Sequence, residues 1–222
     1  MADENEKPDT DSNTARPQPK RGFTPTKSML SDAAWKAEIK KSIGNKSLEH
    51  EYQLGPYFRP SAPYRAKMAP PFEKGPTLII KGRVWSTQEK SGIEATMHVW
   101  HANAAGKYDN EDSEGSQADL PFINRARVHC DDNGFFEFET IYPGGYRRNN
   151  IWRAPHIHFY VEYPGHIPCV IQTYFRDDPY LEADPLVDGS EVIVLTEKER
   201  NGLKYKEGEL EIVLAAERHE PD

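Results

Sequence analysis

The chain has 222 residues, of which 36% are hydrophobic, and a formal net charge of −8. This length fits one medium-sized domain with appendages, and the low apolar content indicates polar segments beside an ordinary core. The apolar runs are short, which disfavours a membrane protein, and the acidic balance disfavours a nucleic-acid-binding protein. Two cysteines disfavour a disulfide scaffold. Together with an N-terminus that lacks an apolar leader, they predict a cytoplasmic protein.

The first 76 residues are expected to form appendages to the main body. Residues 1–30 almost lack large apolar side chains, which predicts a disordered arm. Within residues 31–76, the stretch 31–44 predicts a short amphipathic helix whose apolar side chains share one face: Trp35, Ile39 and Ile43. Residues 51–76 contain six prolines and predict an extended strap over the body. Because the helical stripe needs a cover, we expect a homo-oligomer.

The character of the chain changes at Thr77, where short runs rich in β-branched and aromatic residues begin. Seven such runs predict strands: 77–86, 94–103, 134–141, 155–163, 167–175, 190–197 and 208–216. No long helical period separates them. Residues 77–222 are therefore predicted to form an all-β domain, an antiparallel β-sandwich of transthyretin-like or Greek-key type.

Two histidines share one expected strand. His156 and His158 lie two residues apart, so alternation places both side chains on the same face, as two ligands of one metal require. By contrast, His98 and His101 are three residues apart and fall on opposite faces. On spacing alone, packing across strands is an equally good explanation of the first pair.

Two tyrosines follow expected strand ends closely. Tyr108 comes after the strand 94–103, and Tyr146 leaves the turn formed by Pro143, Gly144 and Gly145. Phenolates are hard anionic donors that suit Fe(III), whereas Zn²⁺ more often takes Cys or carboxylate. The chain has eleven tyrosines, so spacing alone does not select these two as ligands.

Several ordered blocks between about Thr77 and Asp184 resemble the intradiol ring-cleaving dioxygenases, in particular the protocatechuate 3,4-dioxygenase-like branch. The blocks are GRVW, HVWHANAAGKY, RARVHCDDNGFFEFETIYPGGY, WRAPHIHF and IQTYFRDDP. The resemblance covers about half of the chain. It implies a mononuclear non-haem Fe(III) held by four ligands: Tyr108, Tyr146, His156 and His158. Tyr146 and His158 would be the axial pair.

The same resemblance assigns further roles. It places the family's active-site arginine at Arg153 and its glutamine at Gln172, and it makes Tyr146 an acceptor of a substrate proton. A short motif of the strap resembles the segment that covers the substrate in the family: Gly55, Pro56 and Tyr57. Arg153 precedes His156 by three residues, so it can reach the pocket only through a bend at Ala154–Pro155.

The implied reaction is cleavage of an aromatic ortho-diol by O₂ between the two hydroxylated carbons, giving a cis,cis-muconate-type diacid. The diol could be of catechol, protocatechuate or hydroxyquinol type. Leu54 stands where the family has an acid, Trp85–Ser86 where it has Val-Asp, and His101 where it has Gln. These departures bear on the choice of substrate.

Other classes of function stay open at this point. One is another non-haem iron or zinc enzyme, for which His129 and Asp131 form an H-x-D pair typical of Fe(II) oxygenases. That pair adjoins an expected hairpin turn at Asn133–Gly134 and lacks a partner histidine. The other is a metal-free transthyretin-like binding module.

Overall fold

The structure is a computed structural model that describes residues 54–111 and 120–217. The expected arm, residues 1–30, and the expected helix, residues 31–44, lie outside the described residues. Within the described parts, no helix is long and apolar enough to cross a membrane.

Eleven strands and one short helix make up the regular structure of the described residues. The strands are β1 (Thr77–Ser86), β2 (Thr96–Trp100), β3 (Arg125–His129), β4 (Phe135–Ile141), β5 (Tyr146–Arg148), β6 (Ile151–Arg153), β7 (His156–Glu162), β8 (Cys169–Phe175), β9 (Glu191–Ile193), β10 (Leu195–Arg200) and β11 (Leu203–Leu214). The 3₁₀-helix η2 spans Leu181–Ala183.

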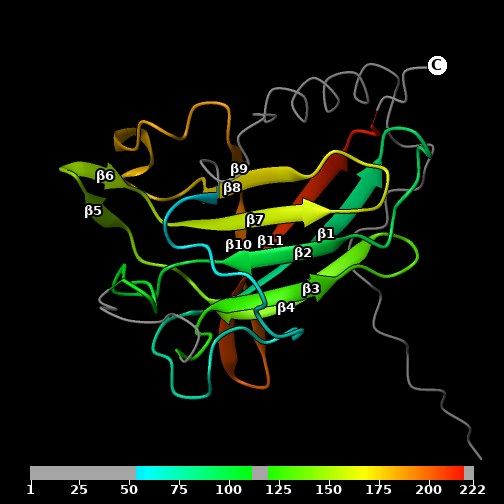
Figure 1. The fold of residues 1–222 in the computed structure, drawn as a ribbon. Helices are drawn as coiled ribbons and strands as arrows, with labels where there is room; N and C mark the ends of the chain where they lie inside the picture. The colour runs from blue at the N-terminus through cyan, green and yellow to red at the C-terminus, as the bar shows by residue number, and fades with distance from the viewer. Residues whose placement is uncertain (1–53, 112–119, 218–222) are drawn as a thin grey trace, which may run out of the picture.

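Two of the sheets stack face to face (Figure 1). One has the strand order β10-β11-β1-β4, the other β3-β2-β7-β8-β9, and β5 pairs with β6 in a separate hairpin. The predicted β-sandwich is confirmed. Most strand pairs are antiparallel as expected, but β1–β11 and β8–β9 are parallel. The last strand lies beside the first and runs in the same direction, which local sequence patterns do not reveal.

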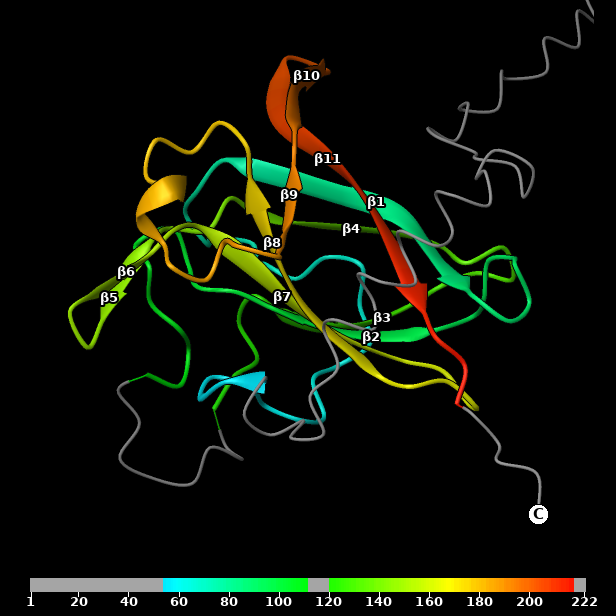
Figure 2. The same cartoon turned by 90° about the horizontal axis from the view of Figure 1, so that it is seen from above.

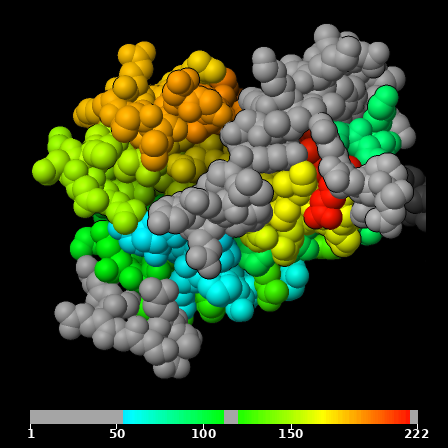
Figure 3. All heavy atoms as spheres, turned by 45° about the horizontal axis from the view of Figure 1, so that its top comes forward, coloured from blue at the N-terminus to red at the C-terminus, as the bar shows by residue number. Residues whose placement is uncertain are grey.

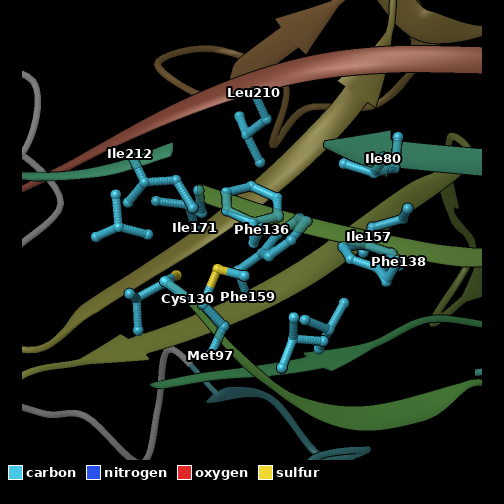
Figure 4. Packing of buried hydrophobic residues seen from close by; sticks show 14 of the residues in the cluster. Ile80, Met97, Cys130, Phe136, Phe138, Ile157, Phe159, Ile171, Leu210 and Ile212 are labelled. Carbon is cyan, nitrogen blue, oxygen red and sulfur yellow. The ribbon is translucent and has the colours of Figure 1, made fainter. Parts of the chain in front are cut away.

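The hydrophobic core lies between these two sheets (Figure 4). From β7, alternation sends Ile157 and Phe159 inward, where they are fully buried beside residues of the facing sheet such as Phe138. The same alternation must turn His156 and His158 to the outer face of the five-stranded sheet. The candidate ligand pair therefore lies outside the core.

The strap closes one side of the sandwich. Tyr64 forms a bridge with Arg127 of β3, and Lys67 forms one with Glu139 of β4, so residues 54–76 contact the edge strands of both sheets. Figure 2 shows the beginning of the strap, in cyan, on the side of β2 and β7 that faces away from β1 and β11. This part covers the outer face on which the histidines lie.

One expected local structure is wrong. The turn at Asn133–Gly134 was expected to close a hairpin, but β3 and β4 belong to different sheets. The turn carries the chain from one layer to the other, and Asp131 Oδ1 stabilises it by accepting hydrogen bonds from the backbone N–H groups of Asn133 and Phe135 at 2.9 and 2.8 Å.

Candidate metal centre and active site

Strand register builds the floor of the site on the outer face of the five-stranded sheet. His158 of β7 lies opposite Trp100 of β2 and Gln172 of β8, and His156 lies opposite Tyr174 of β8. Directly opposed residues share a face, so these side chains form two neighbouring rows. The indole of Trp100 stacks on the His158 ring with 4.9 Å between centroids and 2° between planes, which fixes the orientation of that ring.

The two histidines converge through their Nε2 atoms, which are 3.1 Å apart. Nδ1 of His156 donates to the carbonyl oxygen of Ala154 at 2.6 Å, so its Nε2 keeps a free electron pair. Two nitrogens bound to one metal at about 2.1 Å and at a right angle would lie roughly 3 Å apart. The pair thus has the separation of two adjacent ligands.

Burial also keeps both imidazoles neutral. It lowers the pKa of His156 to about 4, with a further contribution from the positive charge of Arg153. The pKa of His158 is lowered well below its ordinary value, first by burial and then by His156 and Arg153. Neutral imidazole is the form that binds a metal.

The two tyrosines come from loops that touch each other. A Cβ on Gly106 would lie 2.3 Å from the Gly145 carbonyl oxygen, and one on Gly144 would lie 2.4 Å from the Ala104 carbonyl oxygen. Gly106 also has a φ of +78°, which favours glycine. Asn103 joins the loops, because its carbonyl oxygen accepts from the N–H groups of Gly106 and Gly144, both at 2.9 Å. This contact brings Tyr108 and Tyr146 to the same place.

Tyr108 is buried, and its hydroxyl oxygen has no hydrogen-bond partner among the described residues. Burial, reinforced by the neighbouring phenol of Tyr146, raises its pKa well above the ordinary value. The Tyr146 ring is 5.7 Å from the Tyr108 ring and 5.7 Å from the His156 ring. A buried phenol oxygen without a partner, beside two converging nitrogens, is the environment expected where a metal ion belongs.

Other metal-ligating combinations are not supported in the described parts of the chain. No group of three or more His, Cys, Asp or Glu residues there could hold a metal ion. His129 is exposed, and the Asp131 carboxylate is engaged by its own turn. Burial raises the thiol pKa of Cys130 and of Cys169 to about 12, so neither offers a thiolate. The candidate donors that remain among the described residues are two imidazoles and two phenols.

A cavity of about 450 Å³ opens above these donors. Its lining residues are Leu54, Gly55, Pro56, Tyr57, Trp100, Tyr146, Arg148, Arg153, His158, Gln172 and Leu186. In Figure 3 the strap, in cyan, lies against the yellow-green β5–β6 hairpin, and the orange segment after β8 lies on the other side of that hairpin. The volume is in the range of small-molecule sites. Tyr146 lines the cavity, whereas Tyr108 lies behind it.

Arg153 reaches this cavity, and three side chains hold it there. It lies opposite Tyr146 in the β5–β6 hairpin. Its Nε donates to the fully buried Asp184 carboxylate at 3.0 Å, and NH2 donates to Gln172 Oε1 at 2.6 Å and to the Tyr174 hydroxyl at 2.9 Å. Asp184 also accepts from the Ala154 N–H at 2.9 Å, which fixes the bend before β7.

The outcome is a site with two converging imidazoles, two phenols, a fixed guanidinium and a cavity. A family model described as Dioxygenase matches residues 54–216. The chain belongs to the intradiol ring-cleavage dioxygenase family. Members of this family use non-haem iron, which agrees with a donor set of two imidazoles and two phenols.

Named relatives within this family act on several aromatic diols. The chain is 36% identical over 122 residues to a protocatechuate 3,4-dioxygenase beta chain from Burkholderia cepacia, covering 52% of each protein. It is 32% identical over 126 residues to a catechol 1,2-dioxygenase from Acinetobacter baylyi, covering 50% of this chain and 39% of the relative. The chain thus spans about half, or less, of the length of these relatives.

Solved structures share the fold. A 3-chlorocatechol 1,2-dioxygenase from Rhodococcus opacus superimposes with a TM-score of 0.64 at 23% identity, covering 84% of this chain and 90% of that one. The dioxygenase domain of a carbohydrate-binding fusion protein from a Streptomyces species superimposes with a TM-score of 0.59 at 26% identity, covering 73% and 95%.

All the site residues predicted from the sequence lie at this one place. Sequence reasoning missed Asp184, Trp100 and Arg148. Trp100 carried a usable signal, because it ends the strand before Tyr108. Asp184 carried none, since it is one of 36 acidic residues and lies 31 positions after Arg153.

Proposed function

We propose that the protein is an Fe(III)-dependent intradiol dioxygenase that cleaves an aromatic ortho-diol with O₂ between the hydroxylated carbons to give a cis,cis-muconate-type diacid. The diol is of catechol, protocatechuate or hydroxyquinol type. The observation that carries this proposal is the convergence of the two histidine Nε2 atoms, 3.1 Å apart, with two tyrosines at the inner end of a cavity that Arg153 also lines.

In this proposal four side chains hold the iron: Tyr108, Tyr146, His156 and His158. When bound, Fe(III) would acidify the diol hydroxyls and activate the ring towards O₂. The protein contributes ligands that are ready to bind. Both imidazoles are neutral, and the His156 tautomer is set by its hydrogen bond to Ala154.

The two tyrosines have different tasks because only one of them faces the substrate. Tyr146 lines the cavity, so its oxygen, as the phenolate that would hold the iron, could take a proton from a diol hydroxyl. Tyr108 is buried behind it, with Tyr57 stacked on its ring at 4.1 Å between centroids. Tyr108 therefore stays a ligand, sealed from solvent.

Arg153 provides a positive charge whose position does not have to change during the reaction. Three hydrogen-bonding partners, Asp184, Gln172 and Tyr174, hold the guanidinium, so it can stabilise negative charge that builds up on the substrate. The Gln172 oxygen is occupied by Arg153 and by the Tyr174 hydroxyl, which leaves its amide N–H groups for the cavity.

The outer wall comes from the strap. Gly55 has a φ of +71° and turns the chain, and Pro56 and Tyr57 then line the cavity. Phe58 packs against Trp100 at 5.0 Å between centroids, which anchors this turn to the sheet. The segment excludes water from one side of a bound ring.

We also propose a cytoplasmic setting, supported by two buried free cysteines among the described residues, and a homo-oligomer. The apolar stripe on which the oligomer rests, residues 35–43, lies outside the described residues. Mass determination at several protein concentrations tests the oligomer.

The experiment that tests the proposed activity is an iron assay on the purified chain, followed by O₂ uptake with catechol, 3,4-dihydroxybenzoate and hydroxyquinol. We expect about one iron per chain, one O₂ consumed per diol and a ring-opened diacid as product. Iron-loaded protein that consumes no O₂ with any of these diols would refute the proposal.

A further inference from the structure

Two arginines line the cavity, and they differ in what neutralises them. Arg153 contacts the buried carboxylate of Asp184, with 3.0 Å between Nε and Oδ2. Arg148 packs over the ring of Tyr57 and contacts no carboxylate in the part of the chain that the structure describes. The residues lining the cavity include no carboxylate. Among the described residues, no carboxylate therefore pairs directly with the positive charge of Arg148.

The β5–β6 hairpin sets the direction of Arg148. Asn149 and Asn150 have φ values of +49° and +63°, as a two-residue type I′ turn requires, so the hairpin has a fixed register. Arg148 lies two residues after Tyr146, and alternation puts both on the same face of β5. Both indeed line the cavity, whereas Arg147, on the opposite face, does not.

Arg148 lies at the solvent side of the cavity. Its side chain is exposed, and its guanidinium carbon is 5.5 Å from the centroid of the Tyr57 ring. Tyr57 in turn stacks on the buried ligand candidate Tyr108. A diol that turns its hydroxyls to the inner donors would direct the far side of its ring to this outer wall. The Glu111 carboxylate, whose charge helps raise the pKa of Tyr57, accepts a hydrogen bond from the Tyr108 backbone N–H at 3.2 Å.

We infer that Arg148 is a specificity-determining residue, which selects diols with an anionic substituent, a carboxylate, on the side of the ring away from the hydroxyls. This inference rests on the proposed function, because it uses the same cavity and the same orientation of the diol. The planar guanidinium suits bidentate recognition of a carboxylate. Arg148 binds substrate in this account and takes no part in the chemical step.

The test compares each acid with its own amide, which has nearly the same shape but no charge. Two pairs are measured on the iron-loaded chain: 3,4-dihydroxybenzoate and 3,4-dihydroxyphenylacetate, each against its amide. For at least one pair we expect kcat/KM to favour the acid by on the order of tenfold, as for one partly exposed charge-assisted contact. Arg148→Gln should bring this ratio close to one, and Arg148→Lys should keep part of it.

Arg147→Gln is the matched control. It removes the same charge from the same strand, but on the opposite face, and should keep the wild-type acid-to-amide ratio. Raising the salt concentration should lower that ratio in the wild-type protein and leave it unchanged in Arg148→Gln. An acid-to-amide ratio of one or less for both wild-type pairs would overturn the inference, as would an unchanged ratio in Arg148→Gln.

Failure of this inference is distinguishable from failure of the proposed function. If diols are cleaved without preference for acids, the proposed function stands and the role of Arg148 falls. If no diol is cleaved, the proposed function falls, and anaerobic binding of the same acid–amide pairs to the iron-loaded protein then decides on Arg148. Tighter binding of the acid that is lost in Arg148→Gln supports the inference, and equal binding overturns it.

Discussion

The carboxylate of Asp184 is expected to be the main support of Arg153, and Asp184→Asn tests this. The carboxylate is fully buried and accepts hydrogen bonds from Arg153 Nε at 3.0 Å, from the Ala154 N–H at 2.9 Å and from the Leu186 N–H at 2.9 Å. Asparagine keeps the shape but loses the charge. Its NH₂ group cannot accept a hydrogen bond, yet it must replace one of the two oxygens that accept from these N–H donors. Breaking a buried pair of this kind costs about 3–5 kcal/mol. Because the isosteric amide keeps part of the contacts, we expect a loss of about 3 kcal/mol.

Urea unfolding of the metal-free protein at pH 7 measures this loss, with Asp132→Asn as the control. Asp132 is an exposed turn residue, so its substitution should change the free energy of unfolding by less than about 0.5 kcal/mol. In the iron-loaded protein, Asp184→Asn should also lower the turnover of the best diol by roughly ten- to a hundredfold, because Arg153 is less well positioned. An Asp184→Asn protein within about 1 kcal/mol of wild type, with normal turnover, would refute this account of Arg153.

Three further predictions concern the ligands, the loops and pH. His158→Ala should lose most of the iron with an unchanged far-UV spectrum, whereas His129→Ala should keep it; equal iron in both would place the metal elsewhere. Gly106→Ala should cost at least about 2 kcal/mol more in urea unfolding than Gly165→Ala, because both residues have positive φ but only a Cβ at Gly106 meets backbone; similar losses would contradict the loop contact. Burial lowers the pKa of His101 to about 4, so the unfolded state takes up a proton at a higher pH than the folded state. Stability that is present above pH 6.5 is therefore lost as the pH falls towards 4. In the metal-free protein, His101→Gln should make the fall in the free energy of unfolding between pH 6.5 and 4 about 3 kcal/mol smaller. Equal pH dependence of stability in the two proteins would contradict this role of His101.

The parts of the fold that depend on local pattern could be predicted from the sequence. The run 77–86 coincides with β1, and the alternation that predicted a shared face for His156 and His158 agrees with their convergence on the outer face. Pairing between distant strands could not be predicted, because nothing in the residues of β11 reveals that they lie parallel to β1. The same holds for the turn that carries the chain from β3 in one sheet to β4 in the other, because its sequence is also typical of a hairpin.

For the site, the ligand candidates could be found and their supports could not. The tyrosines were identified through the family resemblance, since spacing alone did not distinguish them from nine others. The pairing of Arg153 with Asp184 depends on how the segment after β8 folds back over the hairpin. The direction of Arg148 depends on a two-residue turn whose φ values become visible only in the structure.

The most direct test of the central claim is the visible absorption spectrum of the iron-loaded protein together with its iron content. With Tyr108 and Tyr146 as phenolate ligands, the protein should be coloured by charge transfer from phenolate to Fe(III). Measured per bound iron, the band should be shifted or weakened in Tyr146→Phe. It should be unchanged in Tyr205→Phe, since Tyr205 lies on β11 away from the cavity. A fully iron-loaded protein without this band would contradict the ligand set and, with it, the proposed function.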